Sequence, residues 1–202
     1  MIKLSTLGLR QLLTAICCLV PLTIASLAAA QSPADRAILL VASPELRDPN
    51  FAQTVVLVLF PEEGGPLGVI LNRQTRMTLA EAFADEPQLR QRPEKVYFGG
   101  PVRINALMFL FRSGDAPRNA LPVLDDLYFS GDGSLLDEML AHKKGTVERF
   151  FVGCSGWAPA QLDAEIARGG WYVLPADLDT ILKADPKTMW RLLLGRATAV
   201  KT

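Results

Sequence analysis

Residues 54–71 read TVVLVLFPEEGGPLGVIL, and this segment sets the expectation for the fold. Its first part, residues 54–60, consists of β-branched and apolar residues, which favour a buried β-strand. Residues 61–66 combine two prolines, two glycines and two glutamates, a composition typical of a turn. Residues 67–71 predict a returning strand, so the segment as a whole predicts a hairpin and therefore an antiparallel strand pair.

Strands and helices alternate irregularly on both sides of this hairpin. Several predicted strands follow one another with no helix between them, which implies antiparallel pairing and excludes a regular parallel, doubly wound sheet. The sequence therefore predicts a single α+β domain with a mixed, mostly antiparallel sheet and helices packed on it. Further strands are predicted at residues 37–42, 95–98, 106–112, 127–130, 146–152 and 171–174, and helices at residues 78–85, 134–143, 159–168, 175–182 and 186–194.

Two of these helices carry recognisable start signals. Thr78 is followed by Glu81 three residues later, the spacing of a capping box. Pro159 stands at the first position of the helix predicted over residues 159–168, and Gly169 follows its end.

The composition suits one globular domain. The chain has 202 residues, of which 50% are hydrophobic and 21% are charged, so it is neither mainly disordered nor fibrous. Lys and Arg together number 21, as do Asp and Glu. This balance gives no charge excess that would favour nucleic acid or an anionic membrane surface as a partner.

The first thirty residues have the pattern of a secretory signal peptide. Lys3 and Arg10 precede an apolar run over residues 12–27, and the segment closes with Ala28-Ala29-Ala30. We therefore expect cleavage after Ala30, a mature domain over residues 31–202, and a periplasmic or secreted protein. The alternative is a membrane anchor that is never cleaved, although the apolar run is shorter than the roughly 20 residues of a typical span.

Cys154 is the only cysteine after the signal peptide, and His142 is the only histidine in the chain. Such a pair could serve acyl transfer or hydrolysis, with the thiolate as nucleophile and the imidazole as its base. The alternative is a small buried residue at the end of a strand. The sequence offers no third, orienting residue and no G-x-S-x-G spacing around Ser155. We therefore predict no catalytic residues, no metal site and no cofactor.

Polar side chains share one face of the helix predicted over residues 159–168. Gln161, Glu165 and Arg168 recur at i, i+4 and i+7. They could face a ligand, with Asn72-Arg73 at the end of a strand as their counterpart. They could equally form an internal network that fixes loops.

The glycine-rich segment Gly99-Gly100-Pro101 follows a predicted strand and opens no helix, so a turn is its default interpretation. A backbone nest that binds an anion is the alternative.

Taken in order, these segments resemble the YqgE/AlgH family of small bacterial proteins. The resemblance covers roughly residues 37–175 and implies a single compact domain, but it supplies no activity and no catalytic residues. Some members of that family are labelled transcriptional regulators. The matching segments are residues 42–44, 48–51, 54–57, 65–73, 98–102 and 153–166 with Trp171, and within them the positions of interest are Asn72, Arg73, Gly99, Gly100, Pro101, Gly156, Trp157, Gln161, Glu165 and Trp171.

The sequence departs from the family pattern in two respects. It carries an apparent export signal, and an exported protein cannot bind chromosomal DNA. It also has Cys154 where the family usually has Tyr, which argues against a catalytic cysteine.

The predicted function is therefore a non-enzymatic domain of the cell envelope that binds a protein or a small molecule. A transcriptional regulator and a Cys-dependent hydrolase or transferase are the alternatives. No nucleic-acid partner is expected, and a membrane contact is expected only through an uncleaved signal segment. The predicted binding groove consists of Asn72, Arg73, Gly99, Gly100, Pro101, Gly156, Trp157, Gln161 and Glu165.

Overall fold

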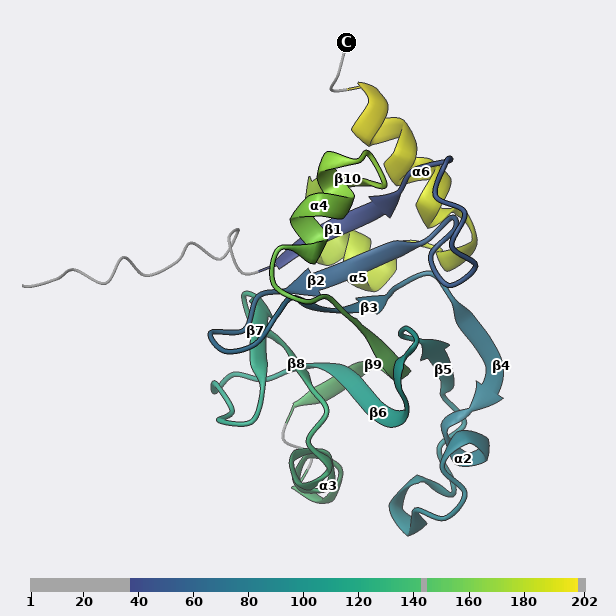
Figure 1. Cartoon of the computed structure of the whole chain (residues 1–202). Helices are drawn as coiled ribbons and strands as arrows, with labels where there is room; N and C mark the ends of the chain where they lie inside the picture. Colours follow the sequence, from purple (N-terminus) through teal and green to yellow (C-terminus); the bar gives the residue numbers. More distant parts are fainter. Residues whose placement is uncertain (1–36, 143–144, 200–202) are drawn as a thin grey trace, which may run out of the picture. The chain divides into compact units, whose positions relative to one another are not determined.

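The computed structural model describes residues 37–142 and 145–199 (Figure 1). The signal peptide predicted over residues 1–30 lies outside the described residues. The strands are β1 (Ala37–Ala42), β2 (Val55–Leu59), β3 (Leu67–Ile70), β4 (Gln74–Thr78), β5 (Lys95–Phe98), β6 (Val102–Arg112), β7 (Leu121–Leu124), β8 (Leu127–Ser130), β9 (Thr146–Gly156) and β10 (Trp171–Pro175). The helices are α2 (Leu79–Ala82), the 3₁₀ turn η1 (Pro87–Leu89), α3 (Gly133–His142), α4 (Gln161–Ala167), α5 (Leu178–Lys183) and α6 (Pro186–Ala199).

The strands form one curled sheet in the order β10-β1-β2-β3-β9-β6-β8-β7, with β4 and β5 attached to the side of β9 (Figure 1). The predicted hairpin is confirmed, because β2 and β3 pair antiparallel with Leu57 opposite Val69. Only the β5–β9 pair is parallel among the described strands. The prediction of an α+β domain with a mixed, mostly antiparallel sheet is therefore confirmed.

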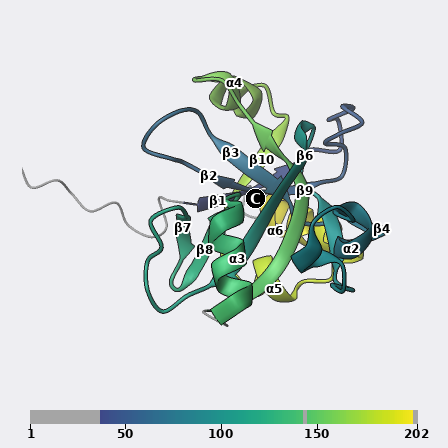
Figure 2. The same cartoon turned by 90° about the horizontal axis from the view of Figure 1, so that it is seen from below.

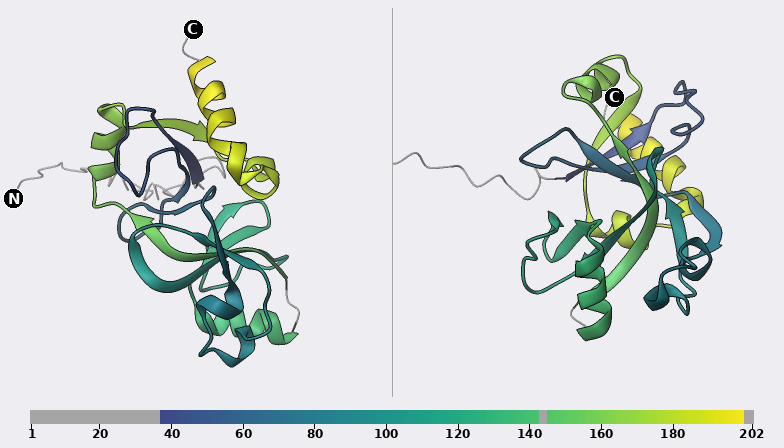
Figure 3. Two further views of the ribbon diagram at one scale, coloured as in Figure 1. Left: turned by 90° about the vertical axis from the view of Figure 1, so that its right-hand side faces the viewer. Right: turned by 60° about the horizontal axis from the view of Figure 1, so that its bottom comes forward.

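The strands β1 and β2 are buried on both faces, which explains their nearly continuous apolar sequence. Alternate residues of the two strands face a core shared with α5 and α6, where Ile181 and Met189 pack. The intervening residues face a second core beneath α4, where Leu162 packs with Trp157 and Trp171. The helices α4 and α6 therefore cover opposite faces of this part of the sheet (Figure 3).

The strands β6 and β9 likewise separate two layers. Leu110 and Phe151 point into the core that they share with β1 and β2. Phe109, Phe111 and Phe150 point the other way and pack under α2, η1 and α3. Figure 2 shows this second layer from the side of α3.

Several boundaries differ from the prediction. The strand β4 was not predicted because most of its residues are exposed and polar, and β7 was not predicted because it contains Pro122, which edge strands tolerate. The capping box of Thr78 and Glu81 is confirmed, but α2 ends at Ala82 because Phe83 leaves the helical conformation. Likewise α4 begins at Gln161 and not at Pro159, because Ala160 has a left-handed backbone with φ of 62°.

None of the helices in the described residues combines the length and the apolar character needed to cross a membrane.

Candidate functional site

Glu165 is the centre of a polar network beneath α4. One carboxylate oxygen, Oε2, accepts hydrogen bonds from the indole N–H groups of Trp157 (3.1 Å) and Trp171 (3.0 Å). The other, Oε1, accepts from Nε2 of Gln161 (3.0 Å), whose own Oε1 accepts from the backbone N–H of Ala158 (3.0 Å). Glu165 thus joins α4 to the residues that end β9 and begin β10.

The electrostatics of this network keep Glu165 ionised. Burial by itself raises the pKa of its carboxyl group. The hydrogen bonds from Trp171, Trp157 and Gln161, together with the charge of Arg168, outweigh that effect and hold the pKa below its ordinary value.

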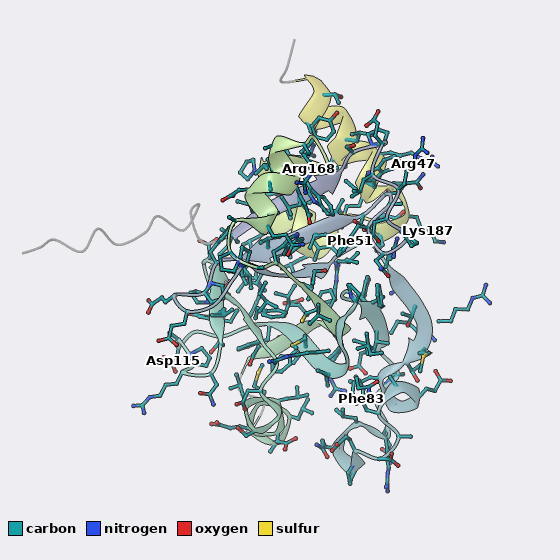
Figure 4. All side chains as sticks on the ribbon, viewed as in Figure 1. Arg47, Phe51, Phe83, Asp115, Arg168 and Lys187 are labelled. Carbon is teal, nitrogen blue, oxygen red and sulfur yellow. The ribbon has the colours of Figure 1, made fainter. Side chains whose placement is uncertain are left out.

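Phe51 connects this network to the loop of residues 43–54. Its ring lies 6.3 Å from the ring of Trp157 and 5.6 Å from that of Trp171, centroid to centroid. Figure 4 labels Phe51 and Arg168 in the same upper part of the domain. The aromatic side chains and the carboxylate therefore hold the loop against α4.

Asn72 and Arg73 hold the same loop from its other side. Oδ1 of Asn72 accepts from the backbone N–H of Val55 and its Nδ2 donates to the carbonyl of Gln53, both at 2.9 Å. Nη2 of Arg73 donates to the carbonyls of Pro49 (2.9 Å) and Ala52 (3.2 Å). Desolvation lowers the pKa of Arg73, and nearby Asp48 opposes that shift.

The glycines that follow β5 lie against the backbone of β9. The N–H of Gly99 donates to the carbonyl of Val152, and its carbonyl accepts from the N–H of Ile70 (3.0 Å) and the hydroxyl of Ser155 (3.1 Å). A Cβ atom at Gly100 would lie 2.4 Å from the carbonyl oxygen of Cys154 and from the Ser155 hydroxyl oxygen. Glycine is therefore needed here for close backbone packing, and the Gly99 amide that an anion nest would use is already bonded.

The predicted groove residues thus fall into three places in the structure. Asn72 and Arg73 bind one side of the loop of residues 43–54, Gln161 and Glu165 hold the other side through the two tryptophans, and the glycines pack against β9. Most of their polar side-chain atoms have partners within the chain. A role of this groove in ligand binding stays a prediction.

A separate open hollow of about 930 Å³ lies beside the end of β9. It contains two residues of the predicted groove, Gly156 and Trp157, and also Cys154. Its volume falls within the range of about 300–1,000 Å³ that is typical of small-molecule sites. Its apolar lining comes from Pro66 and Leu67 before and in β3, Val102, Ala106 and Met108 on β6, and Leu121 and Phe129 on β7 and β8.

One side of the hollow is built by an irregularity between β6 and β9. Val102 pairs with Cys154 and Leu107 with Val152, so the four intervening residues of β6 stand against one of β9, Gly153. The extra residues form a bulge in which Arg103 has a left-handed backbone with φ of 50°. Such a conformation is unfavourable for a residue with a side chain. The structure around Arg103 maintains this conformation. Gly153, with φ of 72°, has no Cβ atom, so the backbone of β9 can pack closely against the bulge.

Two arginines, Arg103 and Arg118, give the hollow a positive charge. Within the described residues neither has an ion-pair partner. The one acidic side chain in the lining, Asp132, is engaged at the start of α3. Its Oδ1 accepts from the hydroxyl of Ser134 and the N–H of Leu135, and its Oδ2 accepts from Nδ2 of Asn119. These bonds, with that from Ser134 the largest contribution, hold the pKa of Asp132 below its ordinary value.

Cys154 is a free, buried thiol, only 2% exposed. Burial raises its pKa and outweighs the opposing effect of Arg103, so the thiol is protonated at neutral pH. The side chain of His142, its predicted partner, lies outside the described residues. Within the described parts of the chain, no group of three or more His, Cys, Asp and Glu side chains is placed to hold a metal ion.

The sequence analysis did not identify Arg103 and Arg118. Arg103 reaches the hollow only because of the bulge, and Arg118 only because β7 and β8 fold back beside β6. The one signal in the sequence was the position of Arg103 directly after the matched segment Gly99-Gly100-Pro101-Val102.

The chain thus folds into a small α+β domain with three features: a curled sheet, a loop of residues 43–54 that polar side chains hold from two sides, and a hollow beside β9. The sequence model of the AlgH-like family matches residues 39–199. The chain therefore belongs to the AlgH-like family, whose biochemical function is uncharacterised.

Relatives and solved structures agree with this assignment. A UPF0301 protein of Streptomyces coelicolor is 38% identical over 164 residues, which cover 78% of this chain and 84% of the relative. One of Chlorobaculum tepidum is 33% identical over 154 residues, covering 75% and 81%. The solution structure of the AlgH protein from Pseudomonas aeruginosa superposes with a TM-score of 0.65 at 27% identity, covering 84% of this chain and 90% of that one. A crystal structure from Corynebacterium diphtheriae, at 24% identity and a TM-score of 0.62, covers 79% and 85% and shares the fold.

Proposed function

We propose that this protein is a non-enzymatic binding domain of the cell envelope and that its ligand occupies the hollow beside β9. The observation that carries the proposal is the combination of an apolar lining with two arginines that have no ion-pair partner among the described residues. A surface of this kind is typical of a site that takes a ligand, because charged groups over apolar surface gain stability when they are paired.

Binding accounts for the hollow better than thiol chemistry does. The nucleophile in a cysteine hydrolase is the thiolate, whose formation is favoured by a lowered pKa. Burial raises the pKa of Cys154, so this thiol is suited to packing against the floor of the hollow. The regulator alternative rests on the label of some relatives, and the equal numbers of acidic and basic residues give it no support.

A neutral fluorescent probe tests whether the hollow binds apolar molecules. N-phenyl-1-naphthylamine brightens in an apolar site, and we expect it to bind the purified mature domain saturably. Ala106 lines the hollow, so the larger side chain of Ala106→Trp should obstruct part of it and weaken saturable binding. Ala84→Trp is the matched control, because Ala84 is exposed near α2 and does not line the hollow. Equal binding by all three proteins, at unchanged melting temperature, would contradict the proposal.

The envelope location is a proposal that rests on the leader pattern of residues 1–30. Fractionation of cells that express the full chain, followed by mass spectrometry of the N-terminus, tests it. A periplasmic product that begins at Gln31 supports export and is incompatible with regulation of chromosomal genes. An intact product in the membrane fraction would indicate an uncleaved anchor, and an intact product in the cytoplasm would contradict export.

A further inference from the structure

We infer that the ligand of the hollow is an amphipathic anion, with an acidic head group paired with the arginines of the lining, Arg103 and Arg118, and an apolar body that covers the partly exposed side chains of Leu67, Ala106 and Leu121. This inference rests on the proposed binding function and specifies the class of ligand.

The charged side chains in the lining of the hollow indicate that the ligand is an anion. Arg103 and Arg118 are exposed, and neither is paired with an acid in the described chain. The Asp132 carboxylate keeps its negative charge, but its hydrogen bonds come from neutral groups at the N-terminus of α3 and from Asn119, and it forms no ion pair with either arginine. The thiol of Cys154, the remaining ionisable group in the lining, is neutral. Among the described residues, the lining of the hollow therefore has two positive charges and one negative charge, and an anion complements this excess of positive charge.

The apolar side chains in the lining of the hollow indicate that the ligand also has an apolar part. Met108 and Phe129 are almost fully buried within the walls, and Leu67, Ala106 and Leu121 are partly exposed beside them. Val102, which also lines the hollow, is 42% exposed. A small inorganic anion would leave the exposed parts of Val102, Leu67, Ala106 and Leu121 in contact with water. An anion with an apolar body would cover them, which adds the hydrophobic contribution to the ionic one.

The backbone of Arg103 is consistent with this role. Its left-handed conformation places a charged side chain in the bulge beside the hollow, where a glycine would be less strained. Strained residues of this kind are found most often at binding and active sites, where surrounding structure maintains them.

The head group could be a carboxylate or a phosphate monoester, because both accept hydrogen bonds from guanidinium groups. Displacement of N-phenyl-1-naphthylamine by undecanoate, decyl phosphate and decanol distinguishes these cases, since the three compounds share one decyl chain. We expect at least one of the two anions to bind about 10-fold more tightly than decanol. The anion that binds more tightly identifies the head group. The advantage should shrink as salt is raised from about 0.05 to 0.5 M, because exposed charges are screened.

Substitutions of the arginines test the assignment of the head group. Arg103→Gln should reduce the affinity of the preferred anion about 5–10-fold and leave that of decanol unchanged, whereas Arg103→Lys should retain part of the advantage. Arg103→Gly removes the charge while suiting the left-handed backbone, so it separates charge from folding. Arg118 also lines a neighbouring hollow of about 510 Å³, so Arg118→Gln is interpreted together with Arg103→Gln.

Arg47→Gln is the matched control for loss of one exposed positive charge. In Figure 4, Arg47 lies at the far side of the view from Asp115, whose loop leads into Arg118. Equal affinity of decanol and both anions, with binding still weakened in Ala106→Trp, would overturn the anionic ligand and leave the proposed function intact. Absence of any probe binding that depends on Ala106 would overturn the proposed function itself.

Discussion

Replacement of Glu165 by alanine should destabilise the domain strongly. Trp157 and Trp171 are 6% and 4% exposed, and both of their indole N–H groups donate to one oxygen of this carboxylate. A buried donor left without an acceptor costs about 1–3 kcal/mol. Two such donors, partly relieved by water that enters from the exposed side of α4, give an expected loss of about 3 kcal/mol in the free energy of unfolding.

The substitution Glu165→Gln separates geometry from charge. An amide oxygen can still accept from both indoles, but the charge is lost and the new NH₂ group faces Nε2 of Gln161. We expect a loss of about 1 kcal/mol for this variant. The matched control is Asp163→Ala, which removes an exposed carboxylate from the first turn of the same helix at a cost of about 0.5 kcal/mol.

Urea unfolding followed by far-ultraviolet circular dichroism is the suitable assay, because two of the three tryptophans contact the substituted group and their fluorescence would change with it. A loss of 3 kcal/mol corresponds to a decrease of about 6–12 °C in melting temperature for a domain of this size. If Glu165→Ala and Asp163→Ala differ by less than about 0.5 kcal/mol, the indoles find acceptors elsewhere and the carboxylate is not the centre of a stabilising network.

Four further outcomes are expected. The pKa of Glu165 is lowered on folding, so its stabilisation is present above the ordinary value of 4.5 and is lost as the pH falls through the folded value. The urea midpoint of the native protein should therefore fall more between about pH 6 and pH 3 than that of Glu165→Gln. Gly100→Ala should give little soluble folded protein because its Cβ would overlap the Cys154 carbonyl, whereas Gly64→Ala, with φ of 91° and open space, should cost only about 1 kcal/mol by urea unfolding. Asn72→Ala should cost about 2 kcal/mol and make the loop of residues 43–54 the first site of limited proteolysis, and an unchanged cleavage pattern would contradict the assigned clamp. Cys154 should react with a thiol reagent at pH 7 far more slowly in the folded protein than in the protein unfolded by urea. Rapid labelling of the folded protein would support the hypothesis that Cys154 is a nucleophile.

Local patterns were sufficient to predict much of the fold. The hairpin of β2 and β3 follows from residues 54–71, and the pairing of Gln161 with Glu165 follows from their i, i+4 spacing. The bonding of Asn72 and Glu165 matches the interpretation of an internal network that fixes loops. In each case the residues involved are close in sequence, or their chemistry allows few other partners.

The hollow could not be predicted because its parts come from pairings that no local pattern specifies. Arg103 lies beside Cys154 only because of the register shift between β6 and β9, strands whose paired residues are 34–52 positions apart. Arg118 lies in a loop before β7, a strand that was not predicted. The apolar residues of the lining have the same periodicity as ordinary core residues, so the sequence cannot distinguish a wall that faces a ligand from one that faces another side chain.

Trp157 contacts both the Glu165 network and the hollow beside β9, so a substitution in the network can also affect the hollow. Its indole N–H bonds to Glu165, its backbone N–H bonds to the carbonyl of Pro66, and the residue lines the hollow. A substitution at Gln161 or Glu165 that weakened ligand binding could thus act through the position of Trp157 rather than through direct contact. Arg103 has no hydrogen bond to this network among the described residues, so its substitution reports on the hollow without disturbing the bonds that hold the loop of residues 43–54. Loss of binding in Glu165→Gln with full binding in both Arg103→Gln and Ala106→Trp would place the ligand at the predicted groove, and the reverse result would place it in the hollow.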